Sequence, residues 1–347
     1  MTVHMPVGWR ALALAAIAAL GTSACFSNKL AVSSREPPVA SSLEALVSGL
    51  AEDMLSSPLL RQELAAKFSG DLPSVEIPPG AIRNDTTRML NRSSSLEEPL
   101  RAVISASGVF NVIDTEALRK AVEEGHPGAD GGIPEIKRLP VADFMLYGHL
   151  AEIREFGSAV RSRLVLKLLD RRTARVVWMG QKDTVPHQSR KTSLHDRLEA
   201  IASKMVDDML SDPRLHRRLA MQFPSGVPTL WSPPGALKNE TSQPEMEGDS
   251  ELLLDSIQMM LLHSGVVGIL DIPTMGKRNA MEEAWALPVA NSGTRPVPQP
   301  VEDWLLFGTL FEFRNGADVH LRLDLQVLDK RSGQIVWRDE DELAFRK

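Results

Sequence analysis

Few residues of this 347-residue chain have the type and spacing that catalysis or metal binding requires. The eight histidines show neither His-x-His nor His-Glu-x-x-His spacing, the patterns that commonly hold a metal ion. Nucleophile settings of the Gly-x-Ser-x-Gly and Ser-x-x-Lys kinds are also missing from the sequence. We therefore predict a protein that is not an enzyme, with no catalytic residue, no cofactor and no metal site.

The single cysteine, Cys25, has the clearest chemical role. It follows a short leader in which Arg10 precedes an apolar run and small residues, as in a secretory signal peptide covering residues 1–24. A cysteine at this place resembles a bacterial lipoprotein processing site, so Cys25 is the predicted lipidated N-terminus. Phe26 at the next position implies sorting to the outer membrane. The alternative is ordinary cleavage near Ala24, which would leave a free thiol.

Tryptophan side chains are the other candidates for a functional role, as anchors in a protein interface. Trp178 and Trp337 each end a predicted strand at repeated positions, which favours a place in the core. Trp285 has no counterpart earlier in the chain and lies beside a proline-rich loop. We predict Trp285 as a possible partner-binding surface.

Composition indicates globular material without affinity for nucleic acid. Hydrophobic residues make up 43% and charged residues 24% of the chain, and the formal net charge is −6. An acidic chain without a basic cluster does not attract the phosphate backbone.

The elements that must position these residues occur twice. Residues 43–68 align without gaps to residues 198–223, with 13 identical positions of 26. This similarity indicates a duplication. We predict a tether at 25–41, a first domain at 42–180, a linker at 181–193 and a second domain at 194–347.

Each copy ends in the pattern of three strands, at 143–178 and 303–337. In the second copy apolar residues alternate strictly with polar ones from Val319 to Val327, the signature of a half-buried strand. Gly333 suits the following turn. Further upstream, Asn84-x-Thr86 and its counterpart at 239–241 favour local side-chain bonds to the backbone.

The predicted fold class is therefore α/β, with two tandem copies of a mixed-sheet domain. Each copy would have its own sheet of about five strands, with helices packed on it. A three-strand antiparallel meander closes each copy, and the earlier strand–helix–strand part favours parallel pairing.

In order and type, these motifs resemble the penicillin-binding-protein activator lipoproteins of the LpoB type. The second copy carries Leu306-Phe307-Gly308, Leu328-Asp329, Ser332-Gly333 and Ile335-Val336-Trp337, followed by an acidic tail. The first copy carries Tyr147-Gly148 and Val176-Val177-Trp178, but has Ala174 at the turn glycine and no acidic finish.

The resemblance implies a non-enzymatic outer-membrane lipoprotein on the periplasmic face, anchored in lipid through Cys25. Its partner would be a bifunctional penicillin-binding protein, which it activates, with no nucleic acid and no small-molecule substrate. The alternative is a structural or assembly component of a secretion system related to curli-secretion lipoproteins. Because the second copy keeps the turn glycine and the acidic tail, we expect partner binding there.

Overall fold

The computed structural model describes residues 43–86, 94–114, 141–154, 160–184, 193–224, 226–242, 249–272, 302–315 and 318–346, all within one compact unit, Val39–Lys347. We call residues 43–184 the first half and residues 193–346 the second half. The predicted signal peptide, Cys25 with its tether, and Trp285 lie outside the described residues.

The structure describes six helices. In chain order they are α2 (Leu43–Ser56), α3 (Pro58–Lys67), α4 (Ser94–Ser107), α6 (Leu194–Ser211), α7 (Pro213–Gln222) and α8 (Asp249–Ser264). Ser57 and Asp212 cap α3 and α7, each directly before a proline at the first helical position. Gly108 and Gly265 follow α4 and α8 with φ of 65° and 68°, the left-handed conformation that ends a helix.

The strands follow the same order in both halves. In the first half they are β1 (Ser74–Glu76), β2 (Ile82–Asn84), β3 (Asn111–Ile113), β4 (Phe144–Arg154), β5 (Val160–Asp170) and β6 (Arg175–Asp183). In the second they are β7 (Thr229–Trp231), β8 (Leu237–Glu240), β9 (Gly268–Leu270), β10 (Trp304–Asn315), β11 (Asp318–Asp329) and β12 (Ile335–Arg346). The predicted meanders are antiparallel, and β1 and β7 pair in parallel with their neighbours, which confirms the predicted fold class.

The described strands form one sheet of 12 rather than the two separate sheets that we expected. The link is an antiparallel contact between β6 and β9, in which Arg175 faces Leu270 and Val176 faces Ile269. The Asp271 amide also donates to the Ala174 carbonyl at 3.0 Å. Strand β6 runs to Asp183, into the predicted linker, and the predicted domain boundaries remain a prediction.

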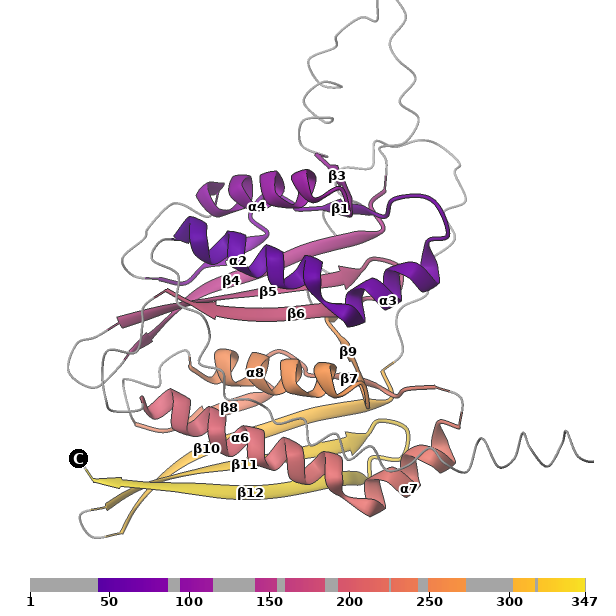
Figure 1. Cartoon of the computed structure of the whole chain (residues 1–347). Coiled ribbons are helices and arrows are strands. Elements are labelled where there is room, and N and C mark those ends of the chain that lie inside the picture. The colour runs from indigo at the N-terminus through magenta and orange to yellow at the C-terminus, as the bar shows by residue number, and fades with distance from the viewer. Residues whose placement is uncertain are drawn as a thin grey trace, which may run out of the picture. The chain divides into compact units, whose positions relative to one another are not determined.

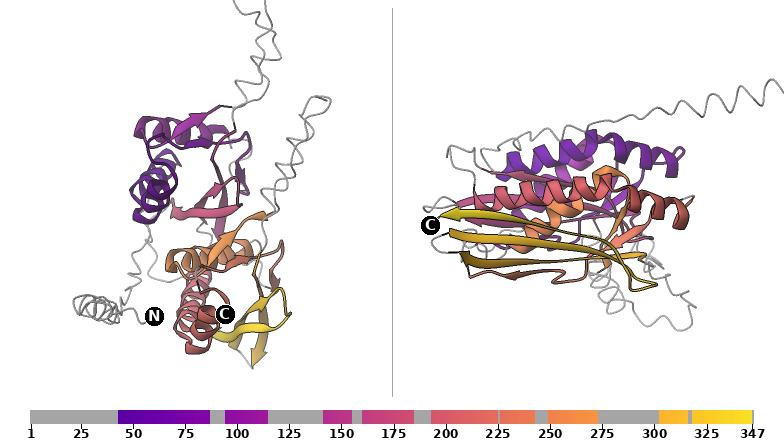
Figure 2. Two further views of the ribbon diagram at one scale, coloured as in Figure 1. Left: turned by 90° about the vertical axis from the view of Figure 1, so that its right-hand side faces the viewer. Right: turned by 90° about the horizontal axis from the view of Figure 1, so that it is seen from below.

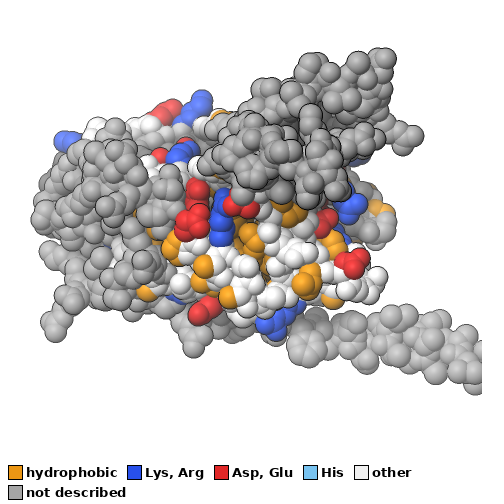
Figure 3. Space-filling model, turned by 90° about the horizontal axis from the view of Figure 1, so that it is seen from above, with side chains coloured by type: hydrophobic (Ala, Val, Ile, Leu, Met, Phe, Trp, Pro, Cys, Tyr) orange, Lys and Arg blue, Asp and Glu red, His pale blue; other side chains and the backbone are white. Residues whose placement is uncertain are grey.

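Helices cover both faces of the first half's meander (Figures 1 and 2). On one face, α2 and α4 bury a first-half core that includes Leu46, Leu100 and Leu166. On the other face, Met145, Val165, Leu169 and Met179 share a second core with α6, α8 and the second half's meander. We use the name seam for the contact between the two halves, which consists of this second core and the β6–β9 pairing. Figure 3 views the first half from the side of α4, where apolar side chains are scattered among charged ones.

Three local predictions from the sequence are confirmed. The Asn84 Oδ1 accepts from the Thr86 amide at 3.0 Å and from its hydroxyl at 2.7 Å. Asn239 and Thr241 make the same two bonds at 3.0 and 2.8 Å. Trp178 and Trp337 are both buried, as expected of core aromatics.

Gly148 and Gly308, which follow Tyr147 and Phe307 in the two halves, are needed for close packing. A Cβ at Gly308 would stand 2.7 Å from both Leu237 and Leu325 and 2.9 Å from the Asp324 carbonyl oxygen. Gly148 is equally confined, against the Val165 backbone. A strand glycine of this kind lets neighbouring elements approach β4 and β10.

Candidate binding site in the second half

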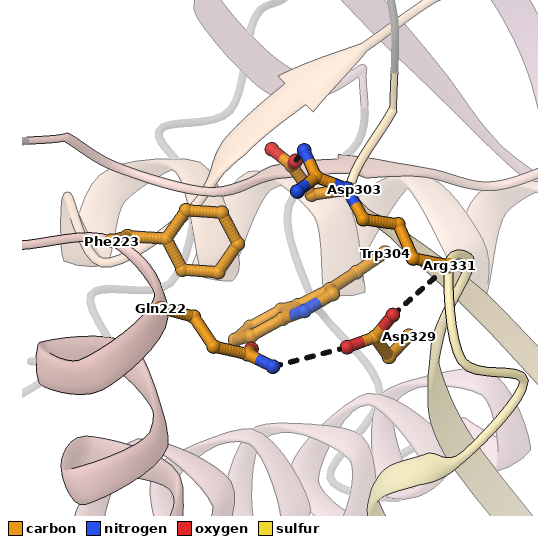
Figure 4. Close-up of a pocket in the computed structure, with 6 residues that line it drawn as sticks. All are labelled: Gln222, Phe223, Asp303, Trp304, Asp329 and Arg331. Atoms are coloured by element: carbon orange, nitrogen blue, oxygen red, sulfur yellow. Dashed lines mark hydrogen bonds and ion pairs between the residues drawn. The ribbon is translucent and has the colours of Figure 1, made fainter.

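A cavity of about 280 Å³ lies where three elements of the second half meet. Its lining comes from the end of α7, the start of β10 and the turn between β11 and β12 (Figure 4): Gln222, Phe223, Asp303, Trp304, Asp329 and Arg331. The rings of Phe223 and Trp304 meet edge to face, with centroids 5.8 Å apart. This apolar wall with polar groups around it has the size and character of a pocket that receives one side chain of a partner.

The two aspartates of the cavity hold its walls in place. Asp303 accepts from the backbone amide and hydroxyl of Thr229, at 2.9 and 3.0 Å, and so fixes the start of β10 beside β7. Asp329 accepts from the amides of Arg331 and Ser332 at 2.9 and 3.0 Å, which closes the turn. Hydrogen bonds from Ser332, Gln222 and Arg331 lower the pKa of Asp329 below its usual value. Both carboxylates therefore serve mainly to build the site.

The unoccupied binding capacity of the cavity lies in its donors. The indole Nε1 of Trp304 is buried and has no hydrogen-bond partner among the described residues. Arg331 extends from the rim with a side chain 79% exposed and a contact of 3.4 Å to Asp303. Arg331 can donate to a carboxylate, carbonyl or hydroxyl oxygen of a partner, whereas the indole N–H lies beneath the surface of the cavity wall.

The corresponding place in the first half is closed. Lys67 stands where Gln222 stands and makes an ion pair of 2.6 Å with Asp170. Burial would raise the pKa of Asp170, but the bonds from Lys67 and from the turn amides outweigh it and lower that pKa. Phe144 replaces Trp304 and packs against Phe68 and Phe110, with ring centroids 5.8 and 6.1 Å apart. Only the second half therefore offers a free ring N–H here.

The structure and the sequence agree only in part on where binding residues lie. Trp304 differs from its counterpart Phe144, which was visible in the sequence, but its position at a strand start gave no sign of a cavity. Arg331 and Gln222 carried no sequence signal, because an arginine in a turn and a glutamine at a helix end are ordinary surface residues. Trp285 and Cys25 remain predictions.

In the described part of the chain, no group of three or more His, Cys, Asp or Glu side chains is arranged to hold a metal ion. No described helix combines the length and the hydropathy that crossing a membrane requires.

Comparison with known families finds a match in the first half. Residues 42–184 match the family described as the peptidoglycan-synthase activator LpoB, which confirms the predicted resemblance over this segment. The tandem duplication is not confirmed by the match and remains a prediction. None of the curated proteins matches the chain.

Three solved structures are similar at low identity. The LpoB C-terminal domain of Salmonella enterica is 14% identical, with a TM-score of 0.24, and the alignment covers 43% of this chain and 98% of that one. For the LpoB C-terminal domain of Escherichia coli the identity is 16% and the TM-score 0.25, with 42% and 97% covered. For lipoprotein GNA1162 of Neisseria meningitidis the values are 13% and 0.22, with 34% and 83% covered.

Proposed function

We propose, from the match of residues 42–184 to the LpoB family, that this chain is a lipoprotein that binds a peptidoglycan synthase and raises its activity without catalysing a reaction itself. The family match is the observation that carries the proposal. In this proposal Cys25 anchors the chain to the periplasmic face of the outer membrane. The partner is a bifunctional penicillin-binding protein.

The second half supplies the partner-binding surface in this proposal. Its cavity offers an aromatic wall of Phe223 and Trp304 and the exposed Arg331, a combination typical of the centres of protein interfaces. Trp285 would extend this surface. Activation by such a surface needs only that it bind the active conformation of the synthase more tightly than the inactive one.

The test uses the lipid-free chain, residues 26–347, with a purified bifunctional penicillin-binding protein from the same bacterium. We expect the rate of glycan polymerisation from lipid II to rise about five-fold or more, the low end of typical allosteric coupling. Unchanged polymerisation and cross-linking at saturating concentrations of the chain would refute activation.

A matched pair of variants tests the binding site. Arg331→Ala at the rim of the cavity should weaken binding to the synthase, measured by biolayer interferometry, by about ten-fold, because arginine is a frequent anchor in interfaces. Arg172 occupies the same turn position in the first half, where the pocket is closed, so Arg172→Ala should leave binding unchanged. Equal effects of the two variants would place the partner elsewhere.

A further inference from the structure

In the seam, the helices of the second half bind the face of the first meander that lies opposite its own helices α2 and α4. We call this face the back of a meander. Arg163 of β5 pairs with Glu199 of α6 at 2.5 Å, and Lys167 of β5 pairs with Asp255 of α8 at 2.6 Å. The same seam pairs the first two residues of β6 with β9. Its recognition elements are thus cations and apolar residues on the sheet, carboxylates on the helices, and a short strand contact.

The second half presents the same kind of sheet surface with nothing described upon it. Strand β12 ends one edge of the sheet, and Ile335, the counterpart of Val176, is 50% exposed where Val176 is 2% exposed. Arg322 stands at the position of Arg163 with a side chain 41% exposed, over the ring of Phe311. Phe313, two residues along, is 40% exposed. Cations and apolar groups are both accessible here.

The first half presents the matching helix surface. On α4, Glu98 occupies the place of Asp255, and it is exposed together with Ala102 and Ser105. Strand β3 ends the other edge of the sheet and is partly exposed along its length, whereas its counterpart β9 is fully buried in the seam. Each of the two surfaces that meet in the seam therefore has an uncovered counterpart on this same chain. One difference is that Gln326 stands at the position of Lys167, the partner of Asp255.

Side-chain sizes at the two uncovered surfaces are complementary. In the seam the sheet carries the small Ala151 and α8 carries Met259 and Leu262, and all three pack against the shared core. At the uncovered positions the large side chain is on the sheet and the small ones are on the helix. Phe311 replaces Ala151 on the sheet, and Ala102 and Ser105 replace Met259 and Leu262 on the helix. Large side chains on one surface would thus meet small ones on the other, as close packing requires.

We propose that a second copy of this chain binds here, with the back of its β10–β12 meander on α4 of the first copy and the start of its β12 beside β3. The contact repeats the seam between molecules and joins two different surfaces. Each added copy leaves one surface of each kind free, so assembly proceeds beyond a dimer to a ring or a filament. Within the acidic run Asp339–Glu342, Glu340 and Glu342 lie on the back of the meander, where Glu340 pairs with Arg322 and Glu342 with His320.

The experiment measures the molecular mass of the lipid-free chain, residues 26–347, by sedimentation velocity across a dilution series. At about 100 μM, enough to fill a contact with a Kd near 1 μM, we expect species larger than dimers that dissociate on dilution. The sheet variant, Phe313→Lys with Ile335→Lys, and the helix variant, Ala102→Arg, should each be monomeric. Met221→Lys changes an 83% exposed residue on α7, outside both surfaces, and should associate like the original chain.

Mixing the two variants gives the sharpest outcome. The sheet variant keeps its α4 surface and the helix variant keeps its meander surface, so an equimolar mixture should form dimers and nothing larger. Circular dichroism of each variant checks that it remains folded. A monomeric original chain at about 100 μM, association of either variant alone, or a mixture that stays monomeric would overturn the proposal.

Discussion

Individual side chains in the seam carry charge into the interior. Arg163 is 2% exposed and is held between Asp183, at 2.7 Å, and Glu199, at 2.5 Å. Burial opposes charging of both Arg163 and Glu199, but their mutual attraction prevails: the pKa of Arg163 is raised and that of Glu199, which also accepts from His195, is lowered. Removal of Arg163 would leave Asp183 with only Arg161, at 3.3 Å, and Glu199 without a guanidinium partner.

Arg163→Met should therefore lower the free energy of unfolding by about 3–5 kcal/mol, the usual cost of breaking a buried ion pair from one side. Arg322 is the matched control, since it has the same position in the second half and its side chain is 41% exposed. Arg322→Met should cost about 1 kcal/mol or less. Urea unfolding in dilute solution measures both variants, and equal losses would show that the seam is not formed.

The sequence could predict local residue roles, but not these buried ones. The bonds of Asn84 to Thr86 follow from the chemistry of an asparagine two residues before a threonine, so they were predictable. Arg161, Arg163 and Lys167 alternate along β5 in a pattern that also describes a solvent-exposed face. Their ion pairs come from Asp196, Glu199 and Asp255, which lie 35 or more residues further along the chain.

At the scale of the element, the turn before the third meander strand differs between the halves. Ala174 stands where the turn glycine is expected, and it keeps the left-handed conformation with φ of 55°, close to the 68° of Gly333. A non-glycine residue there costs about 1–2 kcal/mol. The Ala174 side chain is 1% exposed at the seam, so burial of its methyl group offsets part of this cost.

The two turn positions should therefore respond differently to exchange. Gly333→Ala places a methyl group in open space at positive φ and should destabilise the chain by about 1 kcal/mol. Ala174→Gly relieves the strain but loses a buried methyl group, about 0.8 kcal/mol, and gains freedom in the unfolded state. Its net effect should stay within about 0.5 kcal/mol. Thermal unfolding of both variants tests this contrast.

At the scale of the whole molecule, the sequence predicted the elements and their pairing within each half but not the single sheet. The meanders and helices follow from period and punctuation, which are local signals. The pairing of β6 with β9 rests on two residue pairs between strands that lie far apart in the chain. Neither strand differs in composition from an ordinary edge strand, so no local signal marks this contact.

The seam makes the first half depend on the second, and not equally the reverse. Isolated residues 42–184 would expose Met145, Val165, Leu169 and Met179 together with Arg163, which would keep Asp183 but lose Glu199. An apolar sheet face of this kind drives aggregation. Residues 193–347 would expose a mixed surface, in which Glu199, Asp255 and Gln258 lie beside Met259 and Leu262 and the short strand β9. The back of the second meander is already accessible in the full chain.

We therefore expect the second fragment to be soluble with a cooperative thermal transition, and the first to aggregate or to bind the dye ANS. The second half also shows which substitutions would make the exposed face of the first fragment polar. Asp324 and Arg338 stand at the positions of Val165 and Met179 and form an ion pair of 2.6 Å. Val165→Asp with Met179→Arg in fragment 42–184 should give a soluble domain that does not bind ANS.

In the full chain the same double change buries two charges in the seam and should lower the free energy of unfolding by several kcal/mol. A soluble unmodified first fragment, or a full chain indifferent to the double change, would mean that the halves fold without the seam.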